Sequence, residues 1–182
     1  MSQKRLQAYS KVPALSTAVI LLVGGHGVGK HKLAQALVDL CTDFTLHVRT
    51  ATSLPLPREN DESRSKIDFV VFLIDLSNKL SLSVIESSVK LLDIEYFLGK
   101  VCFVITKATK PELQNVEMTA VTGLCDAYDS PMLCGKIESD EDCRGLARKL
   151  IKMTEIAAGF KPCVTPMLIA STKRTLAFEE TL

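Results

Sequence analysis

A glycine-rich segment, "GGHGVGKH" at residues 24–31, has the residue types and spacing of a phosphate-binding loop. It matches the pattern G-x-x-x-x-G-K-[ST] everywhere except the last position, where His31 replaces Ser or Thr. In that pattern the backbone N–H groups of the turn, here opened by Gly24 and closed by Gly29, surround phosphate oxygens, and Lys30 would reach the terminal phosphates. The missing hydroxyl is a ligand of Mg²⁺, which prefers hard oxygen ligands. The sequence therefore predicts a loop that could hold phosphate but binds the metal poorly.

The other parts of a nucleotide site are also incomplete. Asp75 ends the apolar run at residues 67–75 and could be a metal ligand, but Asn78 stands where the motif D-x-x-G needs glycine. The base-reading motif of small GTPases, N-K-x-D, is replaced by "TKAT", with a slot formed by Thr106, Lys107 and Thr109. Because a threonine cannot make the charged pair of the Asp with guanine, base recognition is also impaired.

Three interpretations of these residues remain open. In the first, the glycines only form a tight turn and Lys30 is a solvated surface side chain, so that Lys30→Ala changes stability by no more than ~0.5 kcal/mol. In the second, the chain is a divergent P-loop GTPase or ATPase that uses Lys30 and Asp75. In the third, it is a scaffold that senses phosphate or a nucleotide without turnover. We favour the first, because the metal ligand, the base reader and the switch segments are all damaged.

The elements that position these residues alternate between apolar runs and helical patterns, which predicts an α/β fold with a mostly parallel sheet. We expect strands at 17–23, 44–50, 67–75, 100–106 and 130–134, the second of them a half-buried edge strand. One helix should start near Gly29, a second should cover 82–92, and a last one should run from a Ser139 cap to Gly159. Another helix should start at Pro111, with an apolar face of Leu113, Val116, Ala120, Leu124 and Ala127.

Length and composition limit the classes of protein to consider. A chain of 182 residues suits one domain, with a core over about 12–170 and flexible ends at 1–11 and 171–182. The net charge of +1 favours no nucleic-acid partner, and no apolar run approaches the ~20 residues that span a bilayer. The six cysteines and three histidines show no metal-binding spacing, so we expect no metal and read the cysteines as small buried residues in a reducing compartment.

Several strings resemble the centromere protein M family: "AVILLVG" at 18–24, "SLPLP" at 53–57, "IDFVVFLIDLSNKLSL" at 67–82, "ESSVK" at 86–90 and "FLGKVCFVIT" at 97–106. Their order and spacing also resemble the family, over about residues 12–170. This resemblance implies a three-layer small-GTPase-like (P-loop NTPase-like) fold with a mostly parallel sheet and reduced or missing switch regions. The chain departs from the family pattern in one respect, because its loop keeps more of the phosphate-binding signature.

The same resemblance implies a function. The implied protein is a non-catalytic pseudo-GTPase without cofactor. It would be a subunit of the inner kinetochore, within the constitutive centromere-associated network, and would lie at the centromere in the nucleus. Such a subunit is needed for kinetochore assembly and chromosome segregation in mitosis. The implied partners are centromere proteins I, H and K, with I as the main contact.

Two apolar segments are candidates for a partner surface. Phe97 and Leu98 precede an expected strand, where turns are normally polar, and Met167 and Leu168 follow the last helix. Either both segments pack on their own domain, or they join into an exposed patch of the kind that marks interfaces. A loop that precedes a parallel strand lies at the end of the sheet opposite the phosphate site, so this patch would be remote from Lys30.

Overall fold

The computed structural model describes residues 6, 16–56, 66–108, 112 and 114–168. At its centre lies a five-stranded sheet in the order β2-β1-β3-β4-β5, in which every neighbouring pair is parallel. The strands are β1 (Thr17–Val23), β2 (Thr45–Ala51), β3 (Phe69–Asp75), β4 (Val101–Thr106) and β5 (Met132–Cys134). The chain moves outward from β1 to β2 and then returns to β3 on the other side of β1, so β1 and β3 flank the point where the strand order reverses.

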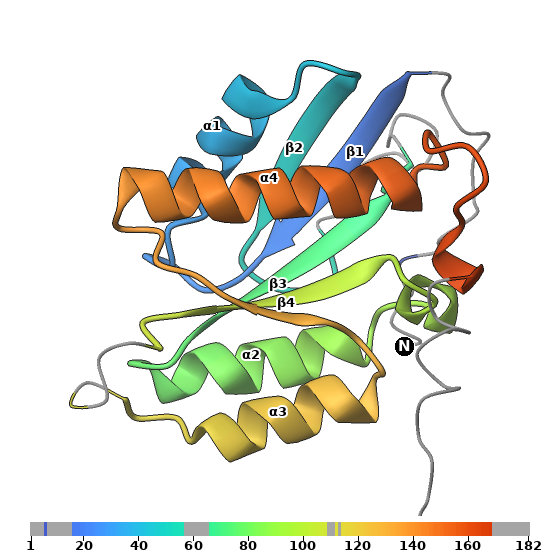
Figure 1. Ribbon diagram of the computed structural model, residues 1–182. Helices are drawn as coiled ribbons and strands as arrows, with labels where there is room; N and C mark the ends of the chain where they lie inside the picture. Colours follow the sequence, from blue (N-terminus) through green and yellow to red (C-terminus); the bar gives the residue numbers. More distant parts are fainter. Residues whose placement is uncertain (1–5, 7–15, 57–65, 109–111, 113, 169–182) are drawn as a thin grey trace, which may run out of the picture.

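Helices cover both faces of the sheet, which makes three layers (Figure 1). One face carries α1 (Lys30–Leu40) and α4 (Asp140–Ala157), and the other carries α2 (Lys79–Val89) and α3 (Met118–Ala127). A short 3₁₀ helix, η1 (Ile94–Phe97), precedes β4. The arrangement is a small-GTPase-like three-layer α/β fold, which confirms the predicted fold class.

The core consists of two apolar clusters, one on each face of the sheet. Every residue of β3 and β4 is buried, as expected for central strands of a parallel sheet covered on both faces. On the face of α2 and α3, Phe72 and Phe103 stack with ring centroids 5.5 Å apart. These two strands therefore form the buried centre of the sheet beside β1, the strand from which the glycine loop projects.

The strand predictions are confirmed to within two residues at each end, and β2 is an edge strand as expected. The predicted cap of α4 is also present, because the Ser139 hydroxyl accepts a hydrogen bond from the Asp142 N–H at 3.4 Å. Gly159, with φ 80°, follows the end of this helix in the left-handed conformation that glycine adopts readily. Apolar periodicity and capping residues thus located most elements from the sequence.

The prediction for α3 is wrong in both its start and its buried face. The helix begins at Met118, and its buried residues are Val121 and Cys125, whereas Ala120 and Ala127 are exposed. Val116 is buried in the preceding connection, where its N–H donates to the Leu76 carbonyl at 3.1 Å. Because the predicted register was counted from Val116, it was displaced by one residue. The predicted positions Pro111 and Leu113 lie outside the described residues.

Three further expectations concern the ends, the cysteines and the membrane. The ends expected to be flexible, 1–11 and 171–182, lie outside the described residues except for Leu6, whose N–H donates to the Leu91 carbonyl at 3.1 Å. Of the cysteines, three are buried, but Cys134 and Cys163 are exposed, so the expectation of burial is wrong for these two. Across 16–56 and the later described ranges, no helix has the length and apolarity needed to cross a bilayer.

Candidate functional site

The glycine loop lies at the carboxyl end of β1 and leads directly into α1. Gly27 (φ 76°) and Gly29 (φ 88°) have left-handed backbone conformations that other residues adopt only with strain. A Cβ atom on Gly29 would also lie 2.7 Å from Cγ2 of Ile137, a buried residue of the connection before α4. The turn therefore requires glycine for its shape, and Ile137 closes it on one side.

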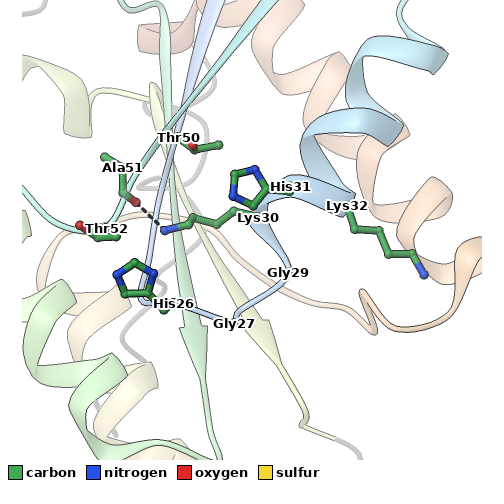
Figure 2. Close-up of a pocket in the computed structure, with 9 residues that line it drawn as sticks. All are labelled: His26, Gly27, Gly29, Lys30, His31, Lys32, Thr50, Ala51 and Thr52. Carbon is green, nitrogen blue, oxygen red and sulfur yellow. Dashed lines mark hydrogen bonds between the residues drawn. The ribbon is translucent and has the colours of Figure 1, made fainter.

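Lys30 is buried beneath this loop, with only 7% of its surface exposed. Its Nζ donates to the carbonyl oxygen of Gly24 and, at 2.9 Å, to that of Ala51 at the end of β2 (Figure 2). Side chains of a helix lean toward its N-terminus, so the first residue of α1 points back into the loop. Burial lowers the pKa of the Lys30 ammonium below its usual range. The prediction of a solvated surface lysine is therefore wrong.

A pocket of about 320 Å³ lies between the loop and the end of β2 (Figure 2). Its lining residues are His26, Gly27, Gly29, Lys30, His31, Lys32, Thr50, Ala51 and Thr52. None of these nine carries a carboxylate, so an ion such as Mg²⁺ would meet imidazoles and ammonium groups, which do not suit it, and only two hydroxyls. Within the described ranges, no three His, Cys, Asp or Glu side chains are grouped to hold a metal ion.

Asp75, the proposed metal ligand, belongs to a different pocket. It lines a second cavity of about 250 Å³ with Gly27, Val28, Gly29, Lys32, Thr106, Lys107, Lys136, Ile137 and Glu138. Neither Lys30 nor His31 lines this cavity. The reason is the strand order, because β2 and β3 flank β1 on opposite sides. The structure thus does not bring Asp75 into the pocket of Lys30 and His31, the residues that the sequence joined to it as a metal and phosphate site.

The Asp75 carboxylate is already engaged by the protein. Its Oδ2 accepts from Lys107 Nζ at 2.8 Å, and its Oδ1 accepts from the N–H and hydroxyl of Ser77 at 2.8 and 2.7 Å. Burial alone would raise the pKa of Asp75, but the hydrogen bonds from Lys107 and Ser77 outweigh it and hold the pKa below its usual range. The one residue that keeps the base-reading pattern, Lys107, is therefore an internal ion-pair partner.

Thr106, the other described residue of the base-reading slot, is also engaged by the protein. The Thr106 hydroxyl donates to the Ile74 carbonyl at 3.3 Å and is buried, and Thr109 lies outside the described residues.

Lys32, which the sequence analysis did not single out, connects the start of α1 to the start of α4 beside the glycine loop. Its Nζ donates to the Glu138 carbonyl at 2.7 Å and pairs with Asp140 Oδ1 at 2.5 Å. The hydrogen bond and charge of Lys32 lower the pKa of Asp140. These partners lie more than 100 residues away in the sequence, and no local pattern indicates them. Three lysines beside the glycine loop, Lys30, Lys32 and Lys107, are thus bound to acceptors of the protein itself.

The apolar segments considered for a partner surface lie at the opposite end of the sheet, before β4 and after α4 (Figure 1). They are adjacent, since a Cβ atom on Gly99 would lie 2.8 Å from Cβ of Pro166. The exposed fractions are 39% for Leu98, 66% for Met167 and 51% for Leu168, and these three residues are called the apolar patch below. Phe97 instead packs inward, with its ring centroid 4.8 Å from that of Tyr128.

One exposed residue near the apolar patch was missed in the sequence. Ile94 is 78% exposed at the start of η1, four residues before Leu98. It falls outside the apolar spacing of Val89 and Leu92, which next reaches the buried Tyr96, and this offset is the signal that could have found it.

Comparison with known proteins gives a consistent result over nearly the whole chain. A family model described as "Centromere protein M (CENP-M)" matches residues 3–176. A curated protein of Danio rerio named Centromere protein M is 38% identical over 167 residues, which cover 92% of this chain and 90% of the relative. Proteins of the same name from Xenopus laevis and Homo sapiens are 36% and 34% identical, and the matches cover 91% and 93% of this chain and 92% and 93% of those relatives.

Proposed function

The chain belongs to the centromere protein M family, and from this membership and the closed glycine loop we propose that it is a non-catalytic pseudo-GTPase with a structural role at the centromere. It acts as a subunit of the inner kinetochore, within the constitutive centromere-associated network. Its task there is to support kinetochore assembly and chromosome segregation in mitosis. Its location is the nucleus, on the centromere of the chromosome.

The observation that carries this proposal is that the lysines of the nucleotide site bind the protein itself. To contact a phosphate, Lys30 would have to leave the carbonyls of Gly24 and Ala51, and an unpaired buried acceptor costs about 1–3 kcal/mol. A metal would have to compete with Lys107 and Ser77 for the Asp75 carboxylate. Binding of a magnesium nucleotide would thus have to break contacts that already stabilise the fold.

A divergent P-loop GTPase or ATPase that uses Lys30 and Asp75 is the second candidate. The left-handed Gly27 and Gly29 and the pocket of about 320 Å³ favour it. Against it stands the engagement of the Asp75 carboxylate by Lys107 and Ser77, because phosphoryl transfer needs a metal ligand that is available to the ion beside the phosphate-binding lysine. The third candidate, a scaffold that senses phosphate without turnover, requires only that Lys30 exchange its carbonyl partners for an anion.

The partners in this proposal are centromere proteins I, H and K, with I as the main contact. The apolar patch of Leu98, Met167 and Leu168 is the proposed contact surface, whereas the neighbouring Phe97 packs inward against Tyr128. Large exposed apolar side chains gathered at one place on a surface are typical of protein interfaces. The net charge of +1 favours no direct contact with nucleic acid, and the proposal includes no membrane and no cofactor.

Reconstitution with the purified partners tests the proposal. The chain is mixed with a complex of centromere proteins I, H and K and analysed by size-exclusion chromatography with multi-angle light scattering. We expect one species whose mass includes this chain, formed equally in the presence and absence of GTP, ATP and Mg²⁺. Separate elution of the chain, or assembly only when a nucleotide is added, would contradict the proposal.

A further inference from the structure

The apolar patch is assembled from two segments that lie far apart in the sequence. Leu98 lies in the connection between η1 and β4, whereas Met167 and Leu168 follow α4. The segments meet at Gly99, because a Cβ atom there would lie 2.8 Å from Cβ, 3.1 Å from Cα and 3.2 Å from the carbonyl oxygen of Pro166. Gly99 and Pro166 are the direct chain neighbours of Leu98 and Met167, so their contact sets the distance between the two halves of the patch.

The half of the patch that holds Leu98 is anchored from inside the protein. The nearby Tyr96 is fully buried, and its hydroxyl donates to the Ile67 carbonyl at 3.1 Å. The Lys100 N–H donates to the Tyr96 carbonyl at 2.9 Å, which closes the chain around Leu98 and Gly99. Leu98 therefore projects from a short connection that is anchored on both sides.

The half of the patch that holds Met167 is a helical turn with a defined shape of its own. Residues 166–168 are helical, and the Thr165 hydroxyl oxygen accepts a hydrogen bond from the Leu168 N–H at 3.2 Å. Pro166 occupies the first helical position, where its fixed φ angle suits the helix and its missing N–H leaves no bond unmade. The turn is thus a preformed unit, and Pro166 is its contact with Gly99.

Gly99 cannot be replaced without moving this turn. Its φ angle is 85°, in the left-handed region that other residues adopt only with strain. A Cβ atom at 2.8 Å from a carbon would lie well inside the ordinary contact distance of about 3.5–4.0 Å. The Pro166 ring cannot rotate aside, and the other near atoms belong to the Pro166 backbone. A side chain at position 99 would therefore push the turn away as a whole and separate Met167 from Leu98.

We propose that Gly99 and Pro166 are positioning residues for partner binding: their direct packing holds the two halves of the apolar patch in one arrangement, which a partner protein contacts as a single surface. The inference rests on the proposed function, in which this patch contacts the complex of centromere proteins I, H and K. Because the halves are already fixed in the free chain, less ordering is needed on binding, and the affinity depends on the contact between Gly99 and Pro166.

The variant Gly99→Ala tests this contact. Its affinity for the complex of centromere proteins I, H and K is measured by fluorescence anisotropy. The Met167 methyl signal of the free variant is recorded by NMR on the full chain labelled with ¹³C-methyl methionine. We expect roughly tenfold weaker binding from the lost preorganisation, together with a shifted Met167 signal and an unchanged circular dichroism spectrum.

The matched control is Gly159→Ala. Gly159 has a similar left-handed φ angle of 80°, but a Cβ atom there would meet nothing within 4 Å. This variant therefore has the same kind of backbone strain without the clash. We expect a lower melting temperature in both variants, but wild-type affinity and a wild-type Met167 signal only in Gly159→Ala.

The variant Pro166→Gly tests the contact from the other side and leaves Gly99 unchanged. It removes the ring that packs on Gly99 and releases the φ angle of the turn. We expect roughly three- to tenfold weaker binding, whereas Pro162→Gly, which loosens the same segment at an exposed residue, keeps the wild-type affinity. This pair of variants decides the question even if Gly99→Ala does not fold.

Failure of the inference and failure of the proposed function give different results. A wild-type chain that does not bind the complex would contradict both together. Wild-type affinity of Gly99→Ala, an equal loss for it and Gly159→Ala, or equal affinities of Pro166→Gly and Pro162→Gly would overturn the inference alone. An unchanged Met167 signal in free Gly99→Ala would do the same, because the arrangement of the patch would then not depend on this contact.

Discussion

The two ends of the central sheet differ in which side chains the protein itself contacts and which it leaves exposed to solvent. At the carboxyl end, Lys30, Lys32 and Lys107 turn toward carbonyls and carboxylates of the protein. At the amino end, Leu98 and Met167 turn toward solvent although they are apolar. A polar group that is satisfied internally is not available to a ligand, whereas an apolar group that stays in water gains free energy when a partner covers it. From this difference we propose that the fold acts through its apolar end.

The largest effect is expected at the apolar patch. The double variant Leu98→Ala and Met167→Glu removes apolar contact area and introduces a charge at the proposed interface with centromere protein I. We expect at least ~100-fold weaker binding to the complex of centromere proteins I, H and K, as for other buried interface anchors, with unchanged circular dichroism. Titration by fluorescence anisotropy or calorimetry measures the change.

The matched control for this variant is Leu80→Glu, which introduces the same charge at a residue of α2 that is 71% exposed and remote from the apolar patch. It should bind like the wild type. Full assembly of the double variant would place the interface elsewhere, and unfolding of it would show that the apolar patch belongs to the core.

The next effect concerns stability at the glycine loop. Lys30→Met keeps a long side chain but removes the donor to the carbonyls of Gly24 and Ala51, so we expect a loss of about 1–3 kcal/mol. For a domain of this size that corresponds to a melting temperature lower by roughly 3–10 °C. Differential scanning calorimetry without nucleotide makes the measurement, with the exposed Lys136→Met as control. Equal melting of the two variants would mean that Lys30 is not part of the structure of the loop.

A smaller effect is expected from the ion pair of Asp75 and Lys107. Because the pKa of Asp75 is lowered in the folded state, its contribution is present above the unfolded pKa and is lost as the pH falls through the folded pKa. Asp75→Asn should therefore cost about 1 kcal/mol at pH 7 and flatten the fall of stability below about pH 4. Urea unfolding between pH 3 and pH 7 measures this, with the exposed Asp126→Asn as control. Parallel pH profiles for wild type and Asp75→Asn would show that the pair contributes nothing.

The fold could be predicted well from the sequence because the central strands of the sheet coincide with continuous apolar runs. The strands β3 and β4 are buried on both faces, and their runs of six and five apolar residues in succession are typical of central strands of a parallel sheet. The error at α3 has the opposite cause. Its segment is rich in small and polar residues, so the buried Val116 of the preceding connection was counted as part of the helical face.

The candidate site was harder to predict, because the partners of its side chains are residues that lie far away in the sequence. A lysine in a phosphate-loop pattern is expected to be a ligand or a solvated side chain, and nothing local shows that the Ala51 carbonyl will accept a hydrogen bond from it. Similarly, Asp75 ends a strand that follows the loop in sequence, but only the strand order shows that it lies on the other side of β1 from His31. Sequence patterns identified the parts, and the topology decided which parts meet.

The smallest expected effect is the response of the melting temperature to nucleotide, which tests directly whether the glycine loop can bind one. The wild-type chain is heated with Mg²⁺ and 5 mM GTP or ATP, which is on the order of 100 times a dissociation constant of tens of micromolar. In a separate experiment, the protein as purified is denatured to recover any bound nucleotide. Because Lys30 is bound to carbonyls of the protein itself, we expect no shift of the melting temperature and no released nucleotide, both in the wild type and in Lys30→Met. A ligand at about 100 times its dissociation constant would add about 2.7 kcal/mol, a rise of roughly 5–10 °C, and a reproducible shift of that size would contradict the account.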